Sequence, residues 1–466
     1  MQPPRPPTRR TNAVTALAGF VQSTHLHEID PEARQVVRTM IATVLGTTVA
    51  GAAEDGCREL RALLLEQGGT PQATSLVYGD HLPAASAALL NGVMARALDY
   101  CDAMAPGLHL GSSLIPAALA AAELRGGISG ADLVTAIAVG AEVGSRLNLT
   151  EALYDGLDPT GVVAPIAATA TAGRILGLST DQLVMALGLA FNRAGGSFQS
   201  NVDGSLAVRL IQGWAAEAGV TCALWAQRGF TGPRRFLDGV YGYAHLYGRD
   251  QVDTTALVKD LGHRYALTGM MFKKFPSCGL SQAVTELALQ AHRSGISADE
   301  VDRVEVVLPP YAYRLVGHPF APGANPRVDA QFSAQFCVAN ALLHGSSKLE
   351  HFTSAAVTSS KATAELAARV HVTADPALDA RGHSAADLIV ITRGSRHSFG
   401  LDIAPGFPGN ALSPEDHDRR FRDCLAAAAY PLSDSQAGRL AESLQNLEDL
   451  PSATGMIADL ISLDAR

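Results

Sequence analysis

The hydrophobic periodicity of the chain changes twice, and those two changes limit the folds that the chain can adopt. From Thr11 to about Leu267 the apolar residues recur at helical spacing, and many of them are Ala or Gly. Alternation of apolar and charged residues then appears, most clearly in Val301–Leu308, where it predicts a strand. Helical spacing returns after Pro405. We therefore expect a mainly α protein with a smaller α+β domain.

The same changes predict the domain boundaries. We expect one large all-helical domain made of residues 11–267 and 405–466, with an α+β lid domain of residues 268–404 inserted into it. A chain of 466 residues is longer than a single core comfortably supports, which agrees with two domains. Residues 1–10 are rich in Pro and Arg but contain no apolar run, so we expect a disordered tail and not a secretion signal.

Several local signals place individual elements. Asp30-Pro31, Ser129 to Asp132 and Ser179 to Gln182 are typical of helix starts, because each puts a capping side chain before the first turn. Residues 388–392 and 398–403 flank a short polar segment and predict a hairpin. These serines are therefore interpreted as helix caps and not as nucleophiles.

Composition excludes some classes of function. The formal net charge of −9 argues against non-specific nucleic-acid binding, which needs a basic surface. The six cysteines are scattered without a Cys-x-x-Cys pair, so we expect reduced thiols in a cytoplasmic protein. The longest apolar run, Leu114 to Ala122, is too short to span a bilayer. Phosphate-loop and dinucleotide motifs are missing from the sequence, and we expect neither a metal nor another cofactor.

The segment that carries most chemical information places an acid and an imidazole ten residues apart. It reads Leu98-Asp99-Tyr100-Cys101-Asp102, followed by Leu108-His109-Leu110-Gly111-Ser112-Ser113 and an Ala-rich helix. This segment resembles the signature of the MmgE/PrpD superfamily, which includes 2-methylcitrate dehydratase, cis-aconitate decarboxylase and iminodisuccinate epimerase. Four more segments resemble the family in the same order: Asp158–Gly161, Asp203–Ala216, Lys273–Gly279 and Pro405–Phe421. The resemblance implies a helical domain with an inserted lid, an active site between them, and a homodimer.

Three residues match the family's catalytic positions: Asp99, His109 and Lys273. Removal of a proton beside a carboxylate or imine needs a base near carbon and a cation or donor near the developing oxyanion. We expect His109 to act as the base, Lys273 to stabilise the charge, and Asp99 to fix the imidazole tautomer or shuttle a proton. The roles of Asp99 and His109 could also be exchanged. Each residue has a structural alternative, as a turn, a cap or a solvated side chain.

Other positions depart from the family pattern. Ala103 stands where relatives carry threonine, Asp158 where they carry histidine, Val208 where they carry lysine, and Phe336 where they carry tyrosine. Buried carboxylates need cationic partners, so this pocket is expected to suit citrate-like substrates poorly. Asp158 would suit an amine or iminium, or it is only a cap before Pro159. The full set of expected substrate-binding residues is Ala103, Asp158, Val208, Arg209, Gln212, Lys274, Ser277, Cys278 and Phe336.

The resulting functional hypothesis is a cofactor-independent isomerase, epimerase or lyase that abstracts an α-proton from a carboxylate, carbonyl or imine. The substrate could be a specialised metabolite that is isomerised or cyclised. One alternative is a dehydratase or decarboxylase of a small di- or tricarboxylate, of the 2-methylcitrate or cis-aconitate type. Another is a non-catalytic dimeric binder of small molecules. The expected partners are a small-molecule substrate and a second copy of the chain, with no nucleic acid and no membrane.

Overall fold

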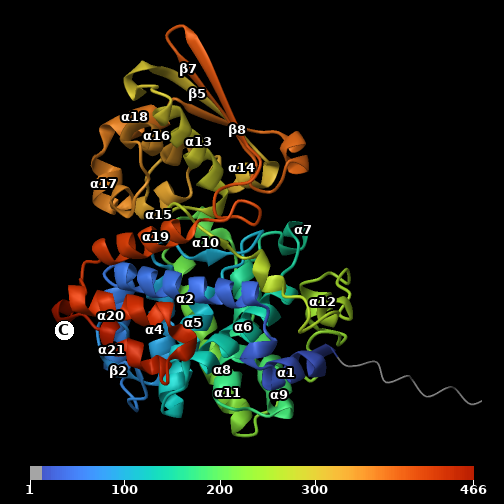
Figure 1. The fold of residues 1–466 in the computed structure, drawn as a ribbon. Coiled ribbons are helices and arrows are strands. Elements are labelled where there is room, and N and C mark those ends of the chain that lie inside the picture. Colours follow the sequence, from blue (N-terminus) through green and yellow to red (C-terminus); the bar gives the residue numbers. More distant parts are fainter. Residues whose placement is uncertain (1–12, 466) are drawn as a thin grey trace, which may run out of the picture.

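The computed structural model describes residues 13–465, so the tail expected for residues 1–10 lies outside the described residues. A large helical part carries a smaller part that contains a mixed sheet (Figure 1). The predicted fold class is therefore confirmed. Within residues 13–465 no helix is long and apolar enough to cross a membrane.

The large part is a bundle in which α11 packs mainly against α8 and α4. Its helices are α1 (Ala13–Ser23), α2 (Pro31–Gly51), α3 (Cys57–Gln67), α4 (Ala84–Arg96), α5 (Gly111–Arg125), α6 (Gly130–Leu147), α7 (Glu151–Tyr154), α8 (Pro159–Ile175), α9 (Thr180–Phe191), α10 (Gln199–Val202), α11 (Ala207–Gln227) and α12 (Tyr243–Leu246). The predicted caps are present: the side chains of Asp30, Ser129 and Ser179 accept hydrogen bonds from the first turns of α2, α6 and α9.

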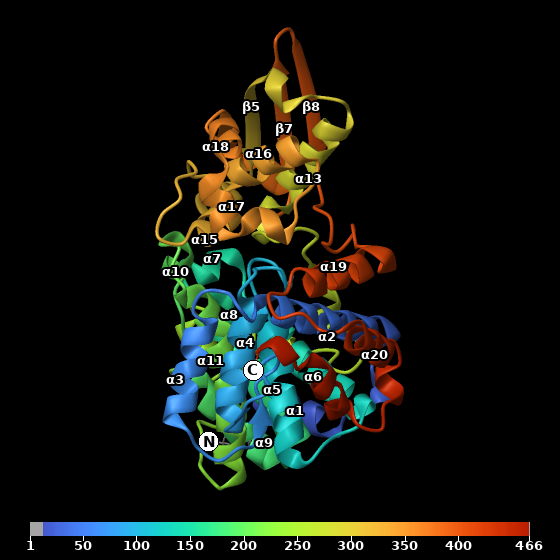
Figure 2. The same cartoon turned by 90° about the vertical axis from the view of Figure 1, so that its left-hand side faces the viewer.

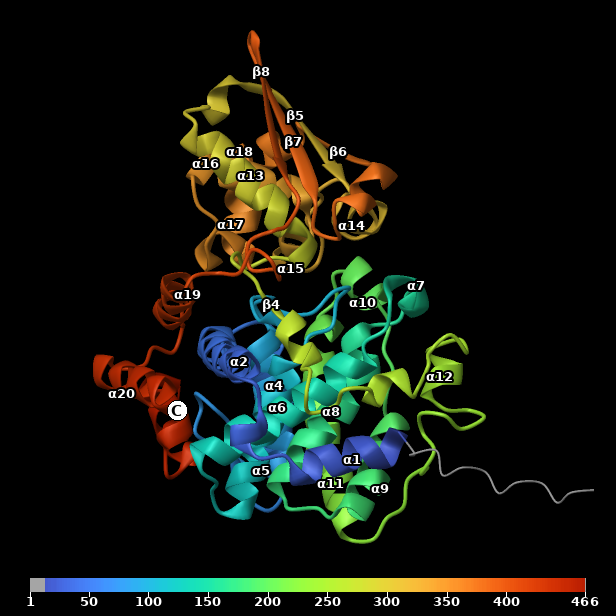
Figure 3. The same cartoon turned by 45° about the vertical axis from the view of Figure 1, so that its right-hand side comes forward.

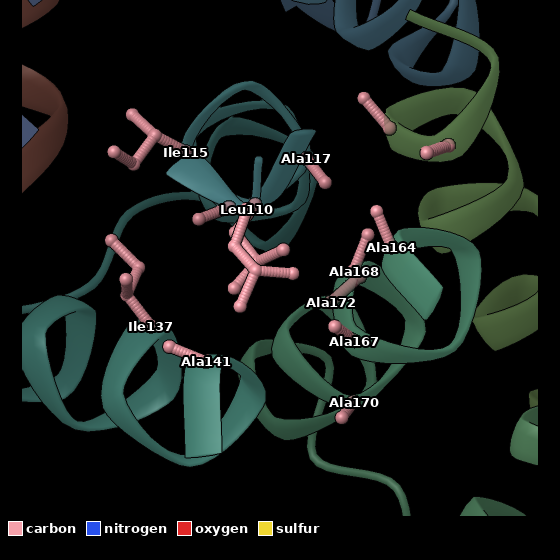
Figure 4. Close-up of a cluster of buried hydrophobic side chains, with 14 of the residues drawn as sticks. Leu110, Ile115, Ala117, Ile137, Ala141, Ala164, Ala167, Ala168, Ala170 and Ala172 are labelled. Atoms are coloured by element: carbon pink, nitrogen blue, oxygen red, sulfur yellow. The ribbon is translucent and has the colours of Figure 1, made fainter. Parts of the chain in front are cut away.

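Small residues let these helices approach closely. A Cβ on Gly213 of α11 would lie 2.6 Å from the Leu89 carbonyl of α4, and one on Gly92 would lie 2.9 Å from the Cα of Gly213. Leu110 lies among Ala side chains of α5, α6 and α8, as Figure 4 shows. It fits there because a Cβ on Gly144 would come within 2.9 Å of it. The alanine and glycine residues of these helices are thus required for close packing. They also surround Leu110, the residue that follows His109.

The helical expectation was wrong in three places within residues 13–267. Short antiparallel pairs join β1 (Ala73–Thr74) to β2 (His81–Leu82), and β3 (Asp102–Ala103) to β4 (Met271–Phe272). Residues 228–269 form mostly turns, because several glycines and Pro233 interrupt helical hydrogen bonding there. The β3–β4 pair matters most, since it brings the segments that carry Asp99 and Lys273 together.

The sheet of the smaller part has the order β6-β5-β7-β8. The predicted strand is β5 (Val301–Leu308), which pairs in parallel with β6 (Val370–Ala374) and antiparallel with β7 (Ala386–Thr392). The predicted hairpin is formed by β7 and β8 (Ser395–Leu401), but its turn is only Arg393-Gly394 and not residues 393–397. Gly394 has φ 127°, a conformation that glycine adopts without strain and that allows the shorter turn. The prediction missed β6.

Helices cover the sheet and connect the smaller part to the bundle. They are α13 (Gln282–Arg293), α14 (Pro310–Val316), α15 (Pro326–Gln331), α16 (Ala334–His344), α17 (Ser354–Ser359) and α18 (Lys361–Ala367). The chain then returns through α19 (Pro414–Ala426), α20 (Asp434–Gln445) and α21 (Met456–Leu460). Figures 2 and 3 show α19 between the sheet-containing part and α2, against which it packs. Leu440 of α20 and Leu460 of α21 belong to the core of the bundle. The domain boundaries themselves stay a prediction.

Candidate active site

A cavity lies where the helical bundle meets the sheet-containing part. It holds about 610 Å³ of space that is not filled by atoms and that includes its opening to solvent. The bundle contributes the end of α4, the segment between α4 and α5, Asp158 before α8, and residues at α10 and in α11. The smaller part contributes the segment from β4 to residue 280, Leu315 of α14 and three later loops. Its polar lining residues are Arg96, Asp99, His109, Asp158, Asn201, Gln212, Lys273, Cys278 and His383.

Three charged side chains form a buried cluster at one wall. Asp99 Oδ1 accepts hydrogen bonds from Lys273 Nζ, at 2.7 Å, and from Arg96 Nη1. Lys273 Nζ also donates to the backbone carbonyl of Asp99 at 2.9 Å. Burial tends to raise the pKa of Asp99, but the charges of Arg96 and Lys273 outweigh it and lower that pKa to about 2. The cluster therefore holds two cations around one carboxylate.

His109 is held by a backbone group and not by Asp99. Its Nδ1 lies 2.6 Å from the carbonyl oxygen of Asp102, which can only accept, so Nδ1 carries the proton. Burial, together with the charges of Arg96 and Lys273, lowers the pKa of His109 well below its ordinary value. The imidazole is thus neutral at pH 7, and its Nε2 is the nitrogen left to exchange a proton. The expectation that Asp99 fixes the tautomer was wrong, because the Asp99 carboxylate is bonded to Arg96 and Lys273.

Asp102 fixes the imidazole through its main chain while its side chain caps α5. Asp102 Oδ2 accepts from the N–H groups of Leu110 and Gly111, at 3.1 and 2.9 Å. Asp102 is fully buried. The helix start and the orientation of the base therefore depend on one residue, which the sequence analysis did not assign to the site.

Asp158 is confirmed as a helix cap and also lines the cavity, while its role toward an amine or iminium stays a prediction. Its Oδ1 caps α8 by accepting from the N–H groups of Thr160 and Gly161, at 2.8 and 3.0 Å. It also lines the cavity. Burial raises the pKa of Asp158, opposed by these N–H groups and by Arg96. Asp158 is thus a structural cap that also faces the substrate space.

Seven of the twelve expected site residues line the cavity: Asp99, Ala103, His109, Asp158, Gln212, Lys273 and Cys278. With its amide oriented to satisfy both atoms, Gln212 accepts from Arg96 Nε at 3.1 Å and so supports the charged cluster. Burial raises the pKa of Cys278 to about 11, which makes it a neutral thiol.

The other five lie elsewhere in the described chain. Val208 is buried on α11, and Arg209 donates to the Asp55 carbonyl at 2.6 Å. Lys274 pairs with Glu286, Ser277 shares a hydrogen bond with Ser281, and Phe336 packs against Phe320 and Phe352. The apolar wall of the cavity comes instead from Met104, Phe198, Met271, Leu280, Leu315, Phe332 and Phe407.

The sequence analysis missed Arg96 and His383. Arg96 follows the apolar run of α4 and lies three residues before Asp99, a spacing that permits an ion pair and was available as a signal. His383 lies in the loop before β7, and nothing in the sequence links it to the site. Among residues 13–465 there is no cluster of three or more His, Cys, Asp or Glu side chains that could hold a metal ion.

Comparison with known proteins agrees with this architecture. The MmgE/PrpD N-terminal domain matches residues 15–255, and the MmgE/PrpD C-terminal domain matches residues 275–449. The chain belongs to the MmgE/PrpD family of enzymes.

Individual relatives are distant and share one activity name. Cis-aconitate decarboxylase from Homo sapiens is 26% identical over 395 residues, covering 81% of this chain and 80% of the human protein. The cis-aconitate decarboxylase-like protein oryM from Aspergillus oryzae is 28% identical over 291 residues, covering 57% and 60%. Cis-aconitate decarboxylase from Aspergillus terreus is 31% identical over 226 residues, covering 45% and 46%. Lyases thus predominate among these relatives.

Proposed function

We propose that the chain is a cofactor-independent lyase that decarboxylates a small unsaturated carboxylate, with His109 moving the proton at carbon. The observation that carries the proposal is the neutral His109, held through Nδ1 beside the Arg96–Asp99–Lys273 cluster inside one cavity. The names of the relatives support decarboxylation. The departures of this sequence from the family pattern had instead favoured isomerisation or epimerisation.

The chemistry follows from the charges around the cavity. When the C–C bond to a carboxylate breaks, carbon dioxide leaves and the electron pair remains on carbon, where a conjugated carboxylate can delocalise it. Lys273 and Arg96 supply positive charge for that developing oxyanion. One proton must then be added to carbon. A bound carboxylate favours the protonated form of His109, so substrate and proton should bind together and Nε2 becomes the donor.

The charge balance also limits the substrate. Arg96 and Lys273 carry two positive charges, and Asp99 already neutralises one of them. Asp158 adds a further acid to the same cavity. A tricarboxylate would leave acid groups without cationic partners, which is costly in a buried site. We therefore favour a dicarboxylate over cis-aconitate, because one of its carboxylates can leave as carbon dioxide while the other delocalises the electron pair.

A second candidate is isomerisation or epimerisation, and one observation favours it. The resting imidazole is neutral with Nε2 unprotonated, so it is ready to remove a proton from carbon without first taking one up. Asp158 would then face an amine or iminium on the substrate.

The test is to incubate the protein in D₂O with cis-aconitate and with smaller unsaturated mono- and dicarboxylates, and to follow product and carbon dioxide. Carbon dioxide release with deuterium at the carbon that lost it supports decarboxylation. Deuterium exchange without carbon dioxide supports the second candidate. If no acid gives carbon dioxide release or deuterium exchange, the non-catalytic binder becomes the better account.

Asp158→Asn separates the two candidates further, because asparagine keeps the helix cap and removes the charge. KM for a dicarboxylate should fall in the variant if the substrate is an anion. KM should rise if the substrate carries a positive nitrogen.

A further inference from the structure

Gln331 joins the two segments that supply the charged cluster. Its side-chain Nε2 donates to the carbonyl of Leu98, at 2.6 Å, and to the carbonyl of Pro276, at 3.2 Å. Its own backbone carbonyl accepts from the N–H of Cys278 at 2.9 Å. Leu98 directly precedes Asp99, and Pro276 follows Lys273 by three residues. Gln331 is only 1% exposed, so water does not compete for these bonds.

The Asp99 segment needs such support. Asp99 has φ 49°, in the left-handed region, which a residue other than glycine keeps only when its surroundings hold it there. The carbonyls of Leu98 and Asp99 accept hydrogen bonds from two residues of the smaller part, Gln331 and Lys273 respectively. The conformation that aims Asp99 at Lys273 is thus maintained from across the junction.

We propose that Gln331 is a positioning residue that sets the distance between Asp99 and Lys273, although it touches no substrate. The proposal rests on the proposed function for its catalytic consequence. The geometry requires the amide nitrogen, and not its oxygen, to face the two carbonyls, so a glutamate of the same shape would place an oxygen against both. The restraint therefore depends on two donated hydrogen bonds and not only on the volume of the side chain.

A second restraint acts on the other side of the ion pair. The Tyr100 hydroxyl donates to the carbonyl of Lys274 at 2.9 Å. Arg420 of α19 donates to the Tyr100 carbonyl at 2.9 Å and lies over the tyrosine ring. Residues on both sides of Asp99 are thus tied to residues after Lys273, which explains how two distant segments keep a 2.7 Å contact.

The test compares Gln331→Met and Gln331→Glu with a matched control, Gln335→Met. Gln335 is also buried in the smaller part and donates to the carbonyl of Gly317 at 2.8 Å, but it contacts neither segment. Two measurements are made on each protein: amide hydrogen exchange by mass spectrometry in peptides 96–104 and 271–280, and kcat and KM for the substrate found in the D₂O screen.

Both Gln331 variants should exchange faster in the two peptides, with unchanged exchange in the core of the bundle, and the control should not. The kcat of Gln331→Met should fall about 100-fold with little change in KM, because displaced catalytic groups lose transition-state stabilisation. Exchange or kcat equal to that of Gln335→Met would overturn the proposal. The exchange arm needs no substrate, so it decides the positioning role even if the proposed function fails.

Discussion

At the scale of single residues, the central feature is a neutral imidazole beside two buried cations. Burial and the charges of Arg96 and Lys273 make protonation of His109 unfavourable without an anion, so they lower its pKa. The bond from Nδ1 to the Asp102 carbonyl selects Nε2 as the reactive atom. Substrate charge and protonation of His109 are therefore linked.

His109→Gln should keep the fold and lose about 100- to 10,000-fold in rate, the usual cost of removing a positioned acid or base. The variant should also alter the pH dependence of stability. Because the folded pKa is depressed, the unfolded chain binds the extra proton, and wild-type stability falls as pH drops below about 6.5. Chemical denaturation at several pH values should show a weaker decline in the variant. An equal decline in both proteins would contradict the assignment of a neutral, partly buried imidazole.

Asp99→Asn should be destabilising by about 3–5 kcal/mol, since it leaves Arg96 and Lys273 buried without a carboxylate. Wild-type stability from this group is fully present above pH 3.8 and is lost as pH falls through its lowered pKa of about 2. Urea unfolding at pH 7 measures the difference. Asp102→Asn would not be an equivalent control, because Asp102 caps α5.

The three proposed catalytic residues could be predicted from the sequence. Asp99, His109 and Lys273 lie in motifs whose residue types match the required chemistry, and the structure brings all three to one cavity. The partner of His109 could not be predicted, because it is a backbone carbonyl, which any residue supplies. Val208 and Phe336 were expected in the pocket because of sequence position, but side-chain direction on α11 and α16 places them in the packing instead.

At the scale of elements, helix crossings in the bundle depend on the absence of a Cβ. Gly213→Ala should destabilise by about 1–3 kcal/mol through overpacking against α4, although alanine is the better helix former. Gly19→Ala in α1 is the matched control, because nothing lies within 4 Å of its added Cβ. That control should stabilise by up to about 1 kcal/mol. Thermal unfolding of both variants tests the contrast, and a stabilised Gly213→Ala would refute the close approach.

Element predictions succeeded where a short-range signal exists. The caps at Ser129 and Ser179 and the alternation in β5 depend on residues a few positions apart. The strand β6 was missed although Val370 and Val372 alternate with polar residues, because five residues form a short pattern. The β3–β4 pair could not be predicted, because its paired residues Asp102 and Phe272 are 170 positions apart and each strand is only two residues long.

At the scale of the whole molecule, the site exists only where the two parts meet. The bundle supplies Arg96, Asp99 and His109, while Lys273, Cys278 and His383 come from beyond residue 270. Sequence periodicity predicted two parts, but it carries no information on which loops face each other across the junction. The β3–β4 pair, together with the contacts of Gln331 and Arg420 with the Asp99 segment, joins the parts in that arrangement.

A homodimer remains a prediction at this scale. Light scattering at micromolar concentration should give about twice the monomer mass of 48.6 kDa. The family resemblance and the large apolar fraction of the bundle motivate it. A monomer mass across that concentration range would count against it.

The most direct measurement is NMR of the reaction in D₂O, comparing wild type with His109→Gln on the best acid from the screen. The account predicts that wild type places deuterium on the carbon beside the departing or retained carboxylate, and that the folded variant places at least 100-fold less. Equal deuterium incorporation by both proteins would contradict proton transfer through His109, which is the central claim.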